Sequence, residues 1–285
     1  MMRKLHRSAA LSHVERIVKK QQLEFSRCLS TESVALDEVF SSQNRLRVTN
    51  LLQDRLVTIR EQKKKKKKKK LDDVSLRTRV SAVLVPFCSV EDQPALLFTR
   101  RSSKLISHRG EISFPGGIAD DADDGDLVQT AVRETCEELG VRDKHIDVWG
   151  EFCLPPNAPL GRGKYLATPV IAHMGDSESL LKDMRPNADE VEKVHFVALK
   201  DLCDLNQQNY TVHKAWRQNP LFDKYYSPLF TPRTLPLDNQ NSQSENSIHI
   251  FGLTALIVCV TLPLLYPRFK HKVQLIEDKK AFSFI

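Results

Sequence analysis

Three glutamates at helical spacing are the strongest chemical feature of this sequence. Glu134, Glu137 and Glu138 lie within the segment from Asp126 to Gly140. On a helix, side chains at positions i, i+3 and i+4 share one arc about 100° wide. Like charges at this spacing destabilise a helix by roughly 0.2–0.5 kcal/mol per pair, and the dipole at the C-terminal end favours cations instead. An arrangement with this cost indicates a binding function.

The carboxylates predict a site for a hard divalent cation. Mg²⁺ and Mn²⁺ take oxygen ligands and keep several water molecules that can react. A solvated acidic face is the simpler interpretation, and it is common where a helix carries two glutamates. Three glutamates at the helix end that the dipole disfavours, directly after Arg133, favour the metal site.

Local signals predict a helix over 127–139. Asp126 is a good N-cap, Gln129 completes a capping-box pattern, and Gly140 supplies the C-terminal stop. The glutamates then lie nearly opposite the side that faces the core. The expected core-facing residues are Val128, Val132, Cys136 and Leu139.

A tight turn is predicted just before this helix, at Pro115-Gly116-Gly117. Glycine accepts backbone angles that other residues avoid, so the chain can turn sharply there and bring its backbone close to the acidic helix. The tripeptide alone is a weak signal. Ahead of a capped helix with the pattern R-E-x-x-E-E-x-G, it becomes a strong one.

Basic side chains gather between a predicted hairpin and this turn. Guanidinium groups suit phosphate oxygens, although an ordinary exposed basic loop has the same composition. Cations for phosphates beside a metal held by carboxylates indicate metal-assisted attack of water on a phosphoanhydride. The cluster consists of Arg100, Arg101, Ser102, Ser103, Lys104, His108 and Arg109.

Interleaved strands and helices must position these groups. The apolar runs 80–87 and 95–99 are separated by a turn-rich stretch and predict a hairpin. Such a pattern, continued along the chain, predicts one mixed α/β domain. The further elements expected are strands at 148–154, 166–172 and 194–197 and helices at 127–139 and 199–205.

The N-terminal 75 residues have a different composition. Residues 1–33 are rich in Arg, Lys, Ser and Ala, which fits a mitochondrial transit peptide; an ordinary basic amphipathic helix is the alternative. Residues 34–75 contain a helical pattern over 34–56, a run of eight lysines at 63–70 and a polar linker. Eight like charges repel one another and stay solvated, as in a tether.

The catalytic domain is expected at 76–272, with a tail at 273–285. Within it, residues 213–248 are polar and read as a long loop, and 249–266 form an apolar helix. The run 250–266 lies at the lower limit for a membrane span. Its basic flank favours a span, whereas its shortness and Pro263 favour a buried helix, which we expect.

The formal charge of +7 does not indicate a nucleic-acid partner. The run of eight lysines accounts for more than all of it, and residues 71–285 carry 24 basic and 29 acidic side chains. The bulk of the protein is therefore mildly acidic, unlike a nucleic-acid-binding surface. Six scattered cysteines without a C-x-x-C pair argue against a zinc ribbon and favour a reducing compartment.

These residues together resemble the Nudix family. The family box is G-x5-E-x7-R-E-U-x-E-E-x-G-U; Gly117–Val141 is similar to it, and Arg133–Val141 carries its second half. The resemblance covers about 80–270 of the 285 residues. The stretches similar to the coenzyme A diphosphatase subgroup are Leu97–Ser102, Gly110, Phe114–Gly117, Arg185–Val191 and Phe251–Ala255.

The resemblance implies a Nudix-type α/β/α sandwich with a mixed sheet and a single catalytic domain. It implies hydrolysis of the diphosphate bond of coenzyme A and acyl-CoA to 3′,5′-ADP and (acyl-)4′-phosphopantetheine, with Mg²⁺ or Mn²⁺ as cofactor. Glu134, Glu137 and Glu138 would bind the metal, and one of them or Glu190 would polarise the attacking water. Arg133 would orient the glutamates.

The resemblance assigns substrate recognition to Arg101 and Ser102. The basic cluster and the glycine turn complete the expected substrate-binding set. Its members are Arg101, Ser102, Lys104, His108, Arg109, Gly116 and Gly117. The mitochondrion, in its matrix, is the location that the subgroup and the N-terminal composition imply.

Three positions depart from the family pattern. Gly125 stands eight positions before Arg133, where the box has Glu, and the stretch between Gly117 and Arg133 is one residue longer than usual in the subgroup. The signature arginine before Gly110 falls at Ile106. Two alternatives stay open: a Nudix hydrolase of another nucleoside diphosphate derivative, such as ADP-ribose or a dinucleotide, and a catalytically weak CoA-binding or membrane-tethered regulatory protein.

Overall fold

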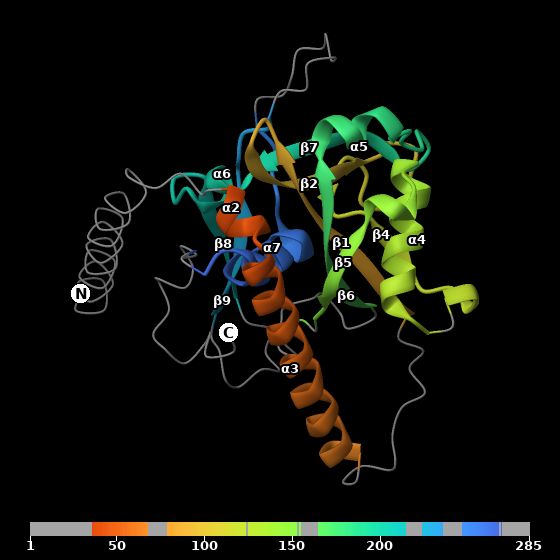
Figure 1. Ribbon diagram of the computed structural model, residues 1–285, viewed down its shortest axis with the longest axis vertical. Helices are drawn as coiled ribbons and strands as arrows, with labels where there is room; N and C mark the ends of the chain where they lie inside the picture. Colours follow the sequence, from red (N-terminus) through yellow and green to blue (C-terminus); the bar gives the residue numbers. More distant parts are fainter. Residues whose placement is uncertain are drawn as a thin grey trace, which may run out of the picture.

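A mixed β-sheet between two layers of helices forms the body of the protein (Figure 1). The computed structural model describes residues 36–67, 79–123, 125–152, 154, 165–214, 224–235, 247–267 and 269. The expected segments 1–33 and 273–285 lie outside these residues. Helices α2 (Leu36–Phe40), α3 (Ser42–Lys67) and α7 (Gly252–Leu265) lie against one face of the sheet, and α4 (Leu127–Leu139) and α5 (Ser177–Asp183) against the other.

The predicted hairpin lies at the centre of the sheet. Strands β1 (Arg79–Val90) and β2 (Gln93–Arg101) pair antiparallel, and β1 pairs in parallel with β6 (Tyr165–Asp176). The remaining pairs of the main sheet are antiparallel, so the sheet is mixed as expected. They join β4 (Gly116–Ile118) to β1, β3 (Ile112–Ser113) and β7 (Val191–Ala198) to β2, and β5 (Asp147–Glu151) to β6.

Alternation along β1 divides the core into two layers. Successive side chains of a strand point to opposite faces. Val85 and Phe87 therefore join the core beneath α3 and α7, whereas Leu84 and Cys88 join the core beneath α4. Both faces of the central strands are buried, which is the three-layer arrangement predicted from the sequence.

The N-terminal helices belong to the folded body. The sequence places residues 34–75 outside the catalytic domain, but Val39, Val48 and Leu52 are buried in the same core as α7. The side chain of Asn44 donates hydrogen bonds to the backbone oxygens of Val39 (2.8 Å) and Leu265 (3.0 Å). The last carbonyls of a helix have no partner within it, so Asn44 satisfies one at the end of α7.

Helix α3 also extends further than its pattern suggests. The expected helix ends at Leu56, whereas α3 continues to Lys67 and so includes the first five residues of the lysine run. The reason lies in the residue type, because lysine has a high intrinsic helix propensity and a positive charge is favourable at a helix C-terminus.

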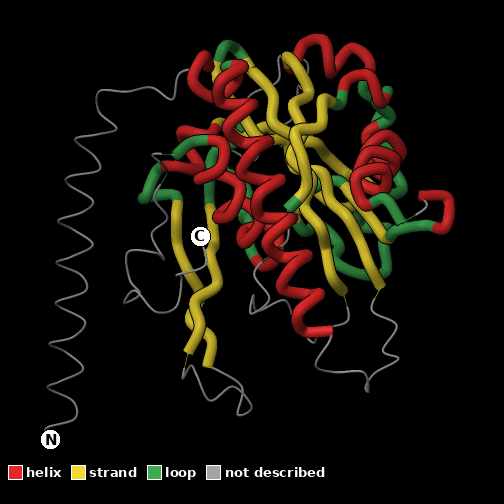
Figure 2. The backbone as a smooth tube through the Cα atoms, turned by 60° about the horizontal axis from the view of Figure 1, so that its bottom comes forward, coloured by secondary structure: helices red, strands yellow, loops and turns green. Residues whose placement is uncertain are grey.

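The prediction of a long loop over 213–248 is wrong for 213–214 and 224–230, and residues 215–223 and 236–246 lie outside the described part of the chain. Strands β8 (Gln208–Lys214) and β9 (Lys224–Phe230) form an antiparallel hairpin beside the main sheet (Figure 2). Phe230 is fully buried and exchanges two backbone hydrogen bonds of 2.9 Å with Ile250. The segment is polar along most of its length, so this pairing with a distant residue was not visible in its composition.

The shorter helices correct two smaller expectations. Helix α6 (Leu199–Cys203) is two residues shorter than the predicted 199–205, and α5 had no counterpart in the prediction. Asp176 begins α5 as its N-cap and accepts a hydrogen bond from the backbone N–H of Ser179 (2.8 Å).

Helix α7 is a buried helix, as expected for the apolar run at 249–266. Nine of its residues are buried, and Pro263 lies inside it. Within the described residues, none of the helices combines the length and apolar character that a membrane crossing requires. The apolar residues instead complete the core that β1, α2 and α3 share.

Replacing Asn44 with alanine will destabilise the protein. The change leaves the backbone oxygens of Val39 and Leu265 without this donor, and it should lower the free energy of unfolding by about 1–3 kcal/mol. Urea unfolding followed by circular dichroism measures the change. Gln53→Ala, at an exposed position of the same helix, is the control; equal stability of the two variants would contradict the proposed role of Asn44.

Candidate active site

Helix α4 has the limits that the sequence predicts. It runs from Leu127 to Leu139, and the Asp126 side chain accepts hydrogen bonds from the N–H groups of Val128 (2.9 Å) and Gln129 (3.4 Å). The N–H of Asp126 donates to the backbone oxygen of Asp123, in place of the Gln129 side chain predicted for it. Half of the expected capping box is therefore present.

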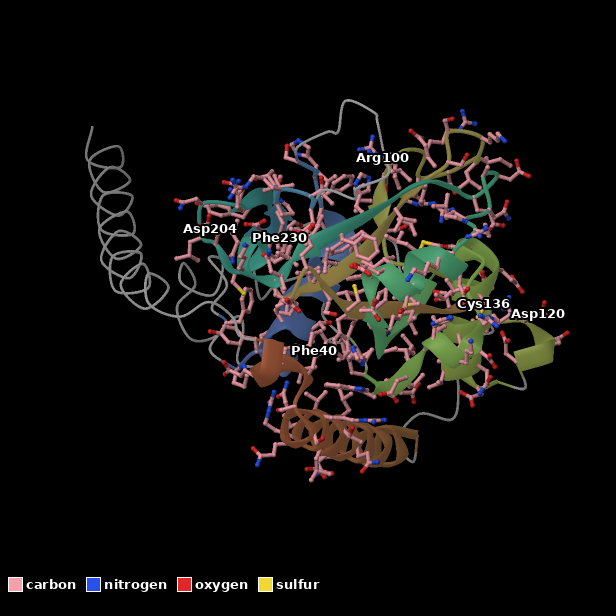
Figure 3. The ribbon with its side chains drawn as sticks, turned by 45° about the horizontal axis from the view of Figure 1, so that its top comes forward. Phe40, Arg100, Asp120, Cys136, Asp204 and Phe230 are labelled. Atoms are coloured by element: carbon pink, nitrogen blue, oxygen red, sulfur yellow. The ribbon has the colours of Figure 1, made fainter. Side chains whose placement is uncertain are left out.

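The expected orientation of α4 is wrong. Its buried residues are Thr130, Ala131, Thr135, Glu138 and Leu139. Of the four residues expected to face the core, Leu139 alone is fully buried, and the others are half-buried. The helix is therefore turned so that part of its acidic arc faces the sheet. Figure 3 shows α4, marked by Cys136, beside the turn that contains Asp120, away from Phe40 of α2.

The rotation of α4 brings two of its glutamates against the glycine turn. The N–H of Gly116 donates a hydrogen bond to the Glu138 carboxylate, and the Gly117 backbone lies directly against the carboxylate of Glu134. A Cβ on Gly117 would overlap that carboxylate, and a Cβ on Gly116 would overlap the backbone of Ala82. The predicted close approach of this turn to the acidic helix is confirmed.

Burial dominates the electrostatics of two of the glutamates. Desolvation raises the pKa of Glu138 to about 8, although the Gly116 N–H and the charge of Arg101 lower it. Desolvation also raises the pKa of Glu134, against the opposing effect of Arg133. The negative charge of Glu190 raises the pKa of both, that of Glu137 raises the pKa of Glu134, and that of Glu134 raises the pKa of Glu138. The site therefore concentrates negative charge where water is largely excluded.

Arg133 connects two of the glutamates to Asp123. Its guanidinium donates to Glu134 (3.0 Å) and Glu137 (3.2 Å) through one nitrogen. The other two nitrogens donate to the two oxygens of the Asp123 carboxylate, each at 2.9 Å. Asp123, which lies in the 3-10 turn η1 (Asp121–Asp123), was not among the site residues predicted from the sequence. The acidic run just before the N-cap was its only signal.

A loop places Glu190 next to the C-terminal end of α4. The N–H of Arg185 donates to the backbone oxygen of Leu139, and the N–H of Asn187 donates to that of Glu138, both at 2.9 Å. Gly140, in the left-handed conformation expected of the helix stop, leaves the space that Arg185 occupies. The loop thus satisfies free carbonyls of α4 and holds Glu190 within electrostatic range of Glu138.

Among the basic residues of the predicted cluster, Arg101 is directed to this site. Its charge lowers the pKa of Glu138, and its Nε is buried without a hydrogen-bond partner in the described part of the chain. A buried donor without a partner is costly. Arg101 is therefore equipped to donate to an anionic group of a bound molecule beside the carboxylates.

Four other members of the cluster, Ser102, Lys104, His108 and Arg109, contact the protein itself. Ser102 is buried, its hydroxyl donates to the backbone oxygen of Ala188 (3.3 Å), and its N–H donates to that of Glu190 (2.8 Å). Ser102 therefore ties β2 to the loop of Glu190. Exposed side chains form the remaining contacts: Lys104 with Asp189 (2.8 Å), His108 with Glu111 (2.9 Å), and Arg109 with the backbone oxygen of Leu105.

The donor set fits a hard divalent cation, although its side chains do not converge as ligands here. No group of three His, Cys, Asp or Glu side chains in the described residues is arranged to hold a metal ion. Glu134 and Glu137 each direct a carboxylate oxygen to Arg133 instead. Buried carboxylates with raised pKa values are nevertheless oxygen donors that a divalent cation would stabilise.

Comparison with known proteins identifies the family. A model of the NUDIX domain matches residues 78–219. Mitochondrial coenzyme A diphosphatase NUDT8 of Mus musculus is 40% identical over 194 residues, which cover 68% of this chain and 81% of the relative. The chain belongs to the Nudix family. The human NUDT8 protein is 38% identical over 192 residues, which cover 67% of this chain and 71% of the relative.

A solved structure of a MutT/nudix family protein from Enterococcus faecalis matches with a TM-score of 0.40 and 18% identity, over 76% of this chain and 72% of that one. As a Nudix hydrolase, the chain acts on phosphoanhydride bonds. The matched residues 78–219 contain helix α4, the glycine turn and the loop of Glu190.

The stability of the metal-free protein should fall as the pH rises. The pKa of Glu138 is about 8 when folded and about 4.5 when exposed, so the folded state retains a proton that the unfolded state releases between these values. Glu138→Gln removes this dependence. In EDTA, we expect the variant to exceed the wild type in unfolding free energy by about 1–3 kcal/mol at pH 9, and by much less at pH 5.

Glu137→Gln is the matched control, because its side chain is 57% exposed and pays little desolvation. Urea titrations at both pH values measure all three proteins. An advantage of Glu138→Gln that is the same at pH 5 and pH 9 would contradict the burial of an ionisable Glu138.

Proposed function

We propose that the protein hydrolyses the diphosphate bond of coenzyme A and acyl-CoA. The products are 3′,5′-ADP and 4′-phosphopantetheine or its acylated form. The observation that carries the proposal is the convergence of Glu134 and Glu138 on the Gly116–Gly117 turn, with the unpartnered Nε of Arg101 beside them. The names of the mouse and human relatives, both mitochondrial coenzyme A diphosphatases, support coenzyme A as the substrate.

Glu134, Glu137 and Glu138 are the residues that would hold Mg²⁺ or Mn²⁺. When bound, the cation supplies charge for the diphosphate oxygens and a source of activated water. Arg133 must then share Glu134 and Glu137 with the cation, and its remaining nitrogens stay fixed by Asp123. The role of the arginine in this proposal is to set the direction of these two carboxylates.

Side chains of the protein move the proton and neutralise the phosphate charge during hydrolysis. Water attacks one phosphorus, its proton passes to a carboxylate, and the bond from that phosphorus to the bridging oxygen breaks, so that each product leaves with a phosphate group. The proton acceptor is one of the α4 glutamates or Glu190, whose loop is bonded to the end of α4 and whose charge acts on Glu134 and Glu138. Arg101 neutralises phosphate charge during this step.

We place the protein in the mitochondrion, in the matrix. The names of the two mammalian relatives and the basic composition of residues 1–33 support this location. Cleavage of a leader before Leu36 would leave α2 and α3 intact, together with their part in the core. The acidic charge of residues 71–285 supports a small-molecule substrate rather than nucleic acid.

A substrate panel tests the activity. The protein is incubated with coenzyme A, acetyl-CoA, ADP-ribose and NADH in the presence of Mn²⁺ or Mg²⁺, and the products are separated by chromatography. We expect 3′,5′-ADP from coenzyme A. Turnover of ADP-ribose or NADH alone would support the alternative Nudix substrate, and no turnover would support the weak CoA-binding protein that Gly125 suggests.

Variants of the helix glutamates link this activity to the site. Glu137→Gln and Glu138→Gln should each lower turnover of coenzyme A by about 100-fold or more, because each loses a charged oxygen ligand. Glu178→Gln, an exposed carboxylate on α5, is the control and should retain wild-type turnover. Full activity in both α4 variants would refute the proposed metal site.

Two glycine variants separate the geometry of the site from stability. In Gly117→Ala the new methyl displaces the flexible side chain of Glu134, so turnover should fall about 10-fold with little loss of stability. In Gly116→Ala the methyl meets the backbone of Ala82, and an alanine is strained at the φ of 151° that Gly116 adopts. The protein itself should therefore be destabilised. Thermal melting and coenzyme A turnover distinguish the two. Full turnover in Gly117→Ala would show that the position of Glu134 is not required.

A further inference from the structure

Counted back from Arg133, the first glutamate of the Nudix box has no counterpart in this chain. Gly125 stands where the box has its first glutamate, eight positions before Arg133. It is exposed, its φ is +74°, and no atom lies within 4 Å of the place where a Cβ would be. This position therefore contributes no side chain to the site.

Asp123, two residues earlier, is built into the site instead. Its side chain is 3% exposed, and its two oxygens receive the Nε and one terminal nitrogen of Arg133, each at 2.9 Å. The Thr130 hydroxyl (2.8 Å) and the Asp120 N–H (2.9 Å) donate to the same carboxylate. These four hydrogen bonds fix the carboxylate and favour its charged form, so the pKa of Asp123 lies well below its usual range.

The bidentate contact determines where the rest of Arg133 points. With Nε and one terminal nitrogen held by Asp123, the other terminal nitrogen is left to donate to Glu134 (3.0 Å) and Glu137 (3.2 Å). A planar guanidinium with two nitrogens fixed has little freedom to rotate. Asp123 thereby acts on both carboxylates without touching either.

We propose that Asp123 is a positioning residue of the active site, which holds Arg133 in the orientation that directs Glu134 and Glu137. The acidic run between Asp120 and Asp126 supplies, from a 3-10 turn, the anion that Gly125 cannot provide. The inference deepens the proposed function and rests on it for the consequence in catalysis. Its consequence for binding of a divalent cation does not depend on the identity of the substrate.

Asp123→Asn tests the proposal, because the amide keeps the shape but places an NH₂ group or a neutral oxygen against Arg133. We expect the dissociation constant for Mn²⁺, measured by electron paramagnetic resonance of the free ion without substrate, to rise about 10-fold. Turnover of coenzyme A should fall about 10- to 100-fold, mostly in kcat, with KM changed less than about 3-fold. Asp121→Asn, an exposed carboxylate of the same turn, is the matched control and should retain wild-type values.

A double-mutant cycle distinguishes positioning through Arg133 from a general loss of structure. In an Arg133→Gln background, Asp123→Asn should change the Mn²⁺ dissociation constant by less than about 2-fold, because the group that it positions is gone. An equal effect in both backgrounds would overturn the proposal. Thr130→Val, which removes one hydrogen bond to Asp123 but no charge, covers the case in which Asp123→Asn does not fold; it should weaken Mn²⁺ binding in the same direction.

The two proposals fail in different ways. If the wild type binds Mn²⁺ but releases no 3′,5′-ADP from coenzyme A, the proposed substrate is wrong and the Asp123 cycle is still read from Mn²⁺ binding. If coenzyme A is hydrolysed and Asp123→Asn matches the wild type in both Mn²⁺ binding and kcat, the positioning role is wrong and the activity stands.

Discussion

The burial of Glu138 between helix α4 and the glycine turn is the contact on which the site depends. Removing a carboxylate from water is costly unless hydrogen bonds or cations compensate for it. Here the Gly116 N–H and Arg101 compensate in part, and the pKa of Glu138 stays raised. A divalent cation would supply the rest, and its binding would then be coupled to folding through this one side chain. The absence of side chains at Gly116 and Gly117 makes the approach possible.

Neighbouring contacts fix the segments that carry the other charged side chains of the site. Two N–H groups of the 184–190 loop bond to the last carbonyls of α4, and Ser102 bonds to the backbone of the same loop. The backbone of Glu190 is therefore fixed by main-chain contacts. Arg133 is fixed by a buried carboxylate, that of Asp123. Rigid support of this kind lets like charges lie close together.

The opposite face of the sheet serves a different purpose. There α2, α3 and α7 form an apolar core with the residues of β1 and β2 that point away from α4. Asn44 and Arg47 of α3 donate to the last carbonyls of α7, so segments from the two ends of the chain support each other. The charge cluster stands on one side of the sheet, and much of the apolar packing that must offset its cost stands on the other.

The sequence by itself determined the features that local chemistry controls. The limits of α4, its N-cap and C-terminal glycine, the β1–β2 hairpin, the glycine turn and the family box are all written in short stretches of residues. Only the tertiary structure decided the rotation of α4, the partner of Arg133, the docking of α3 and the β8–β9 hairpin. The periodicity of apolar residues predicted that Val132 and Cys136 face the core, because it reflects only the transfer of apolar side chains from water. It does not reflect the close approach to Glu134 and Glu138 that two glycines permit. Contacts between residues far apart in the sequence determine the rotation of α4 and the docking of α3, and no short window of sequence contains both partners.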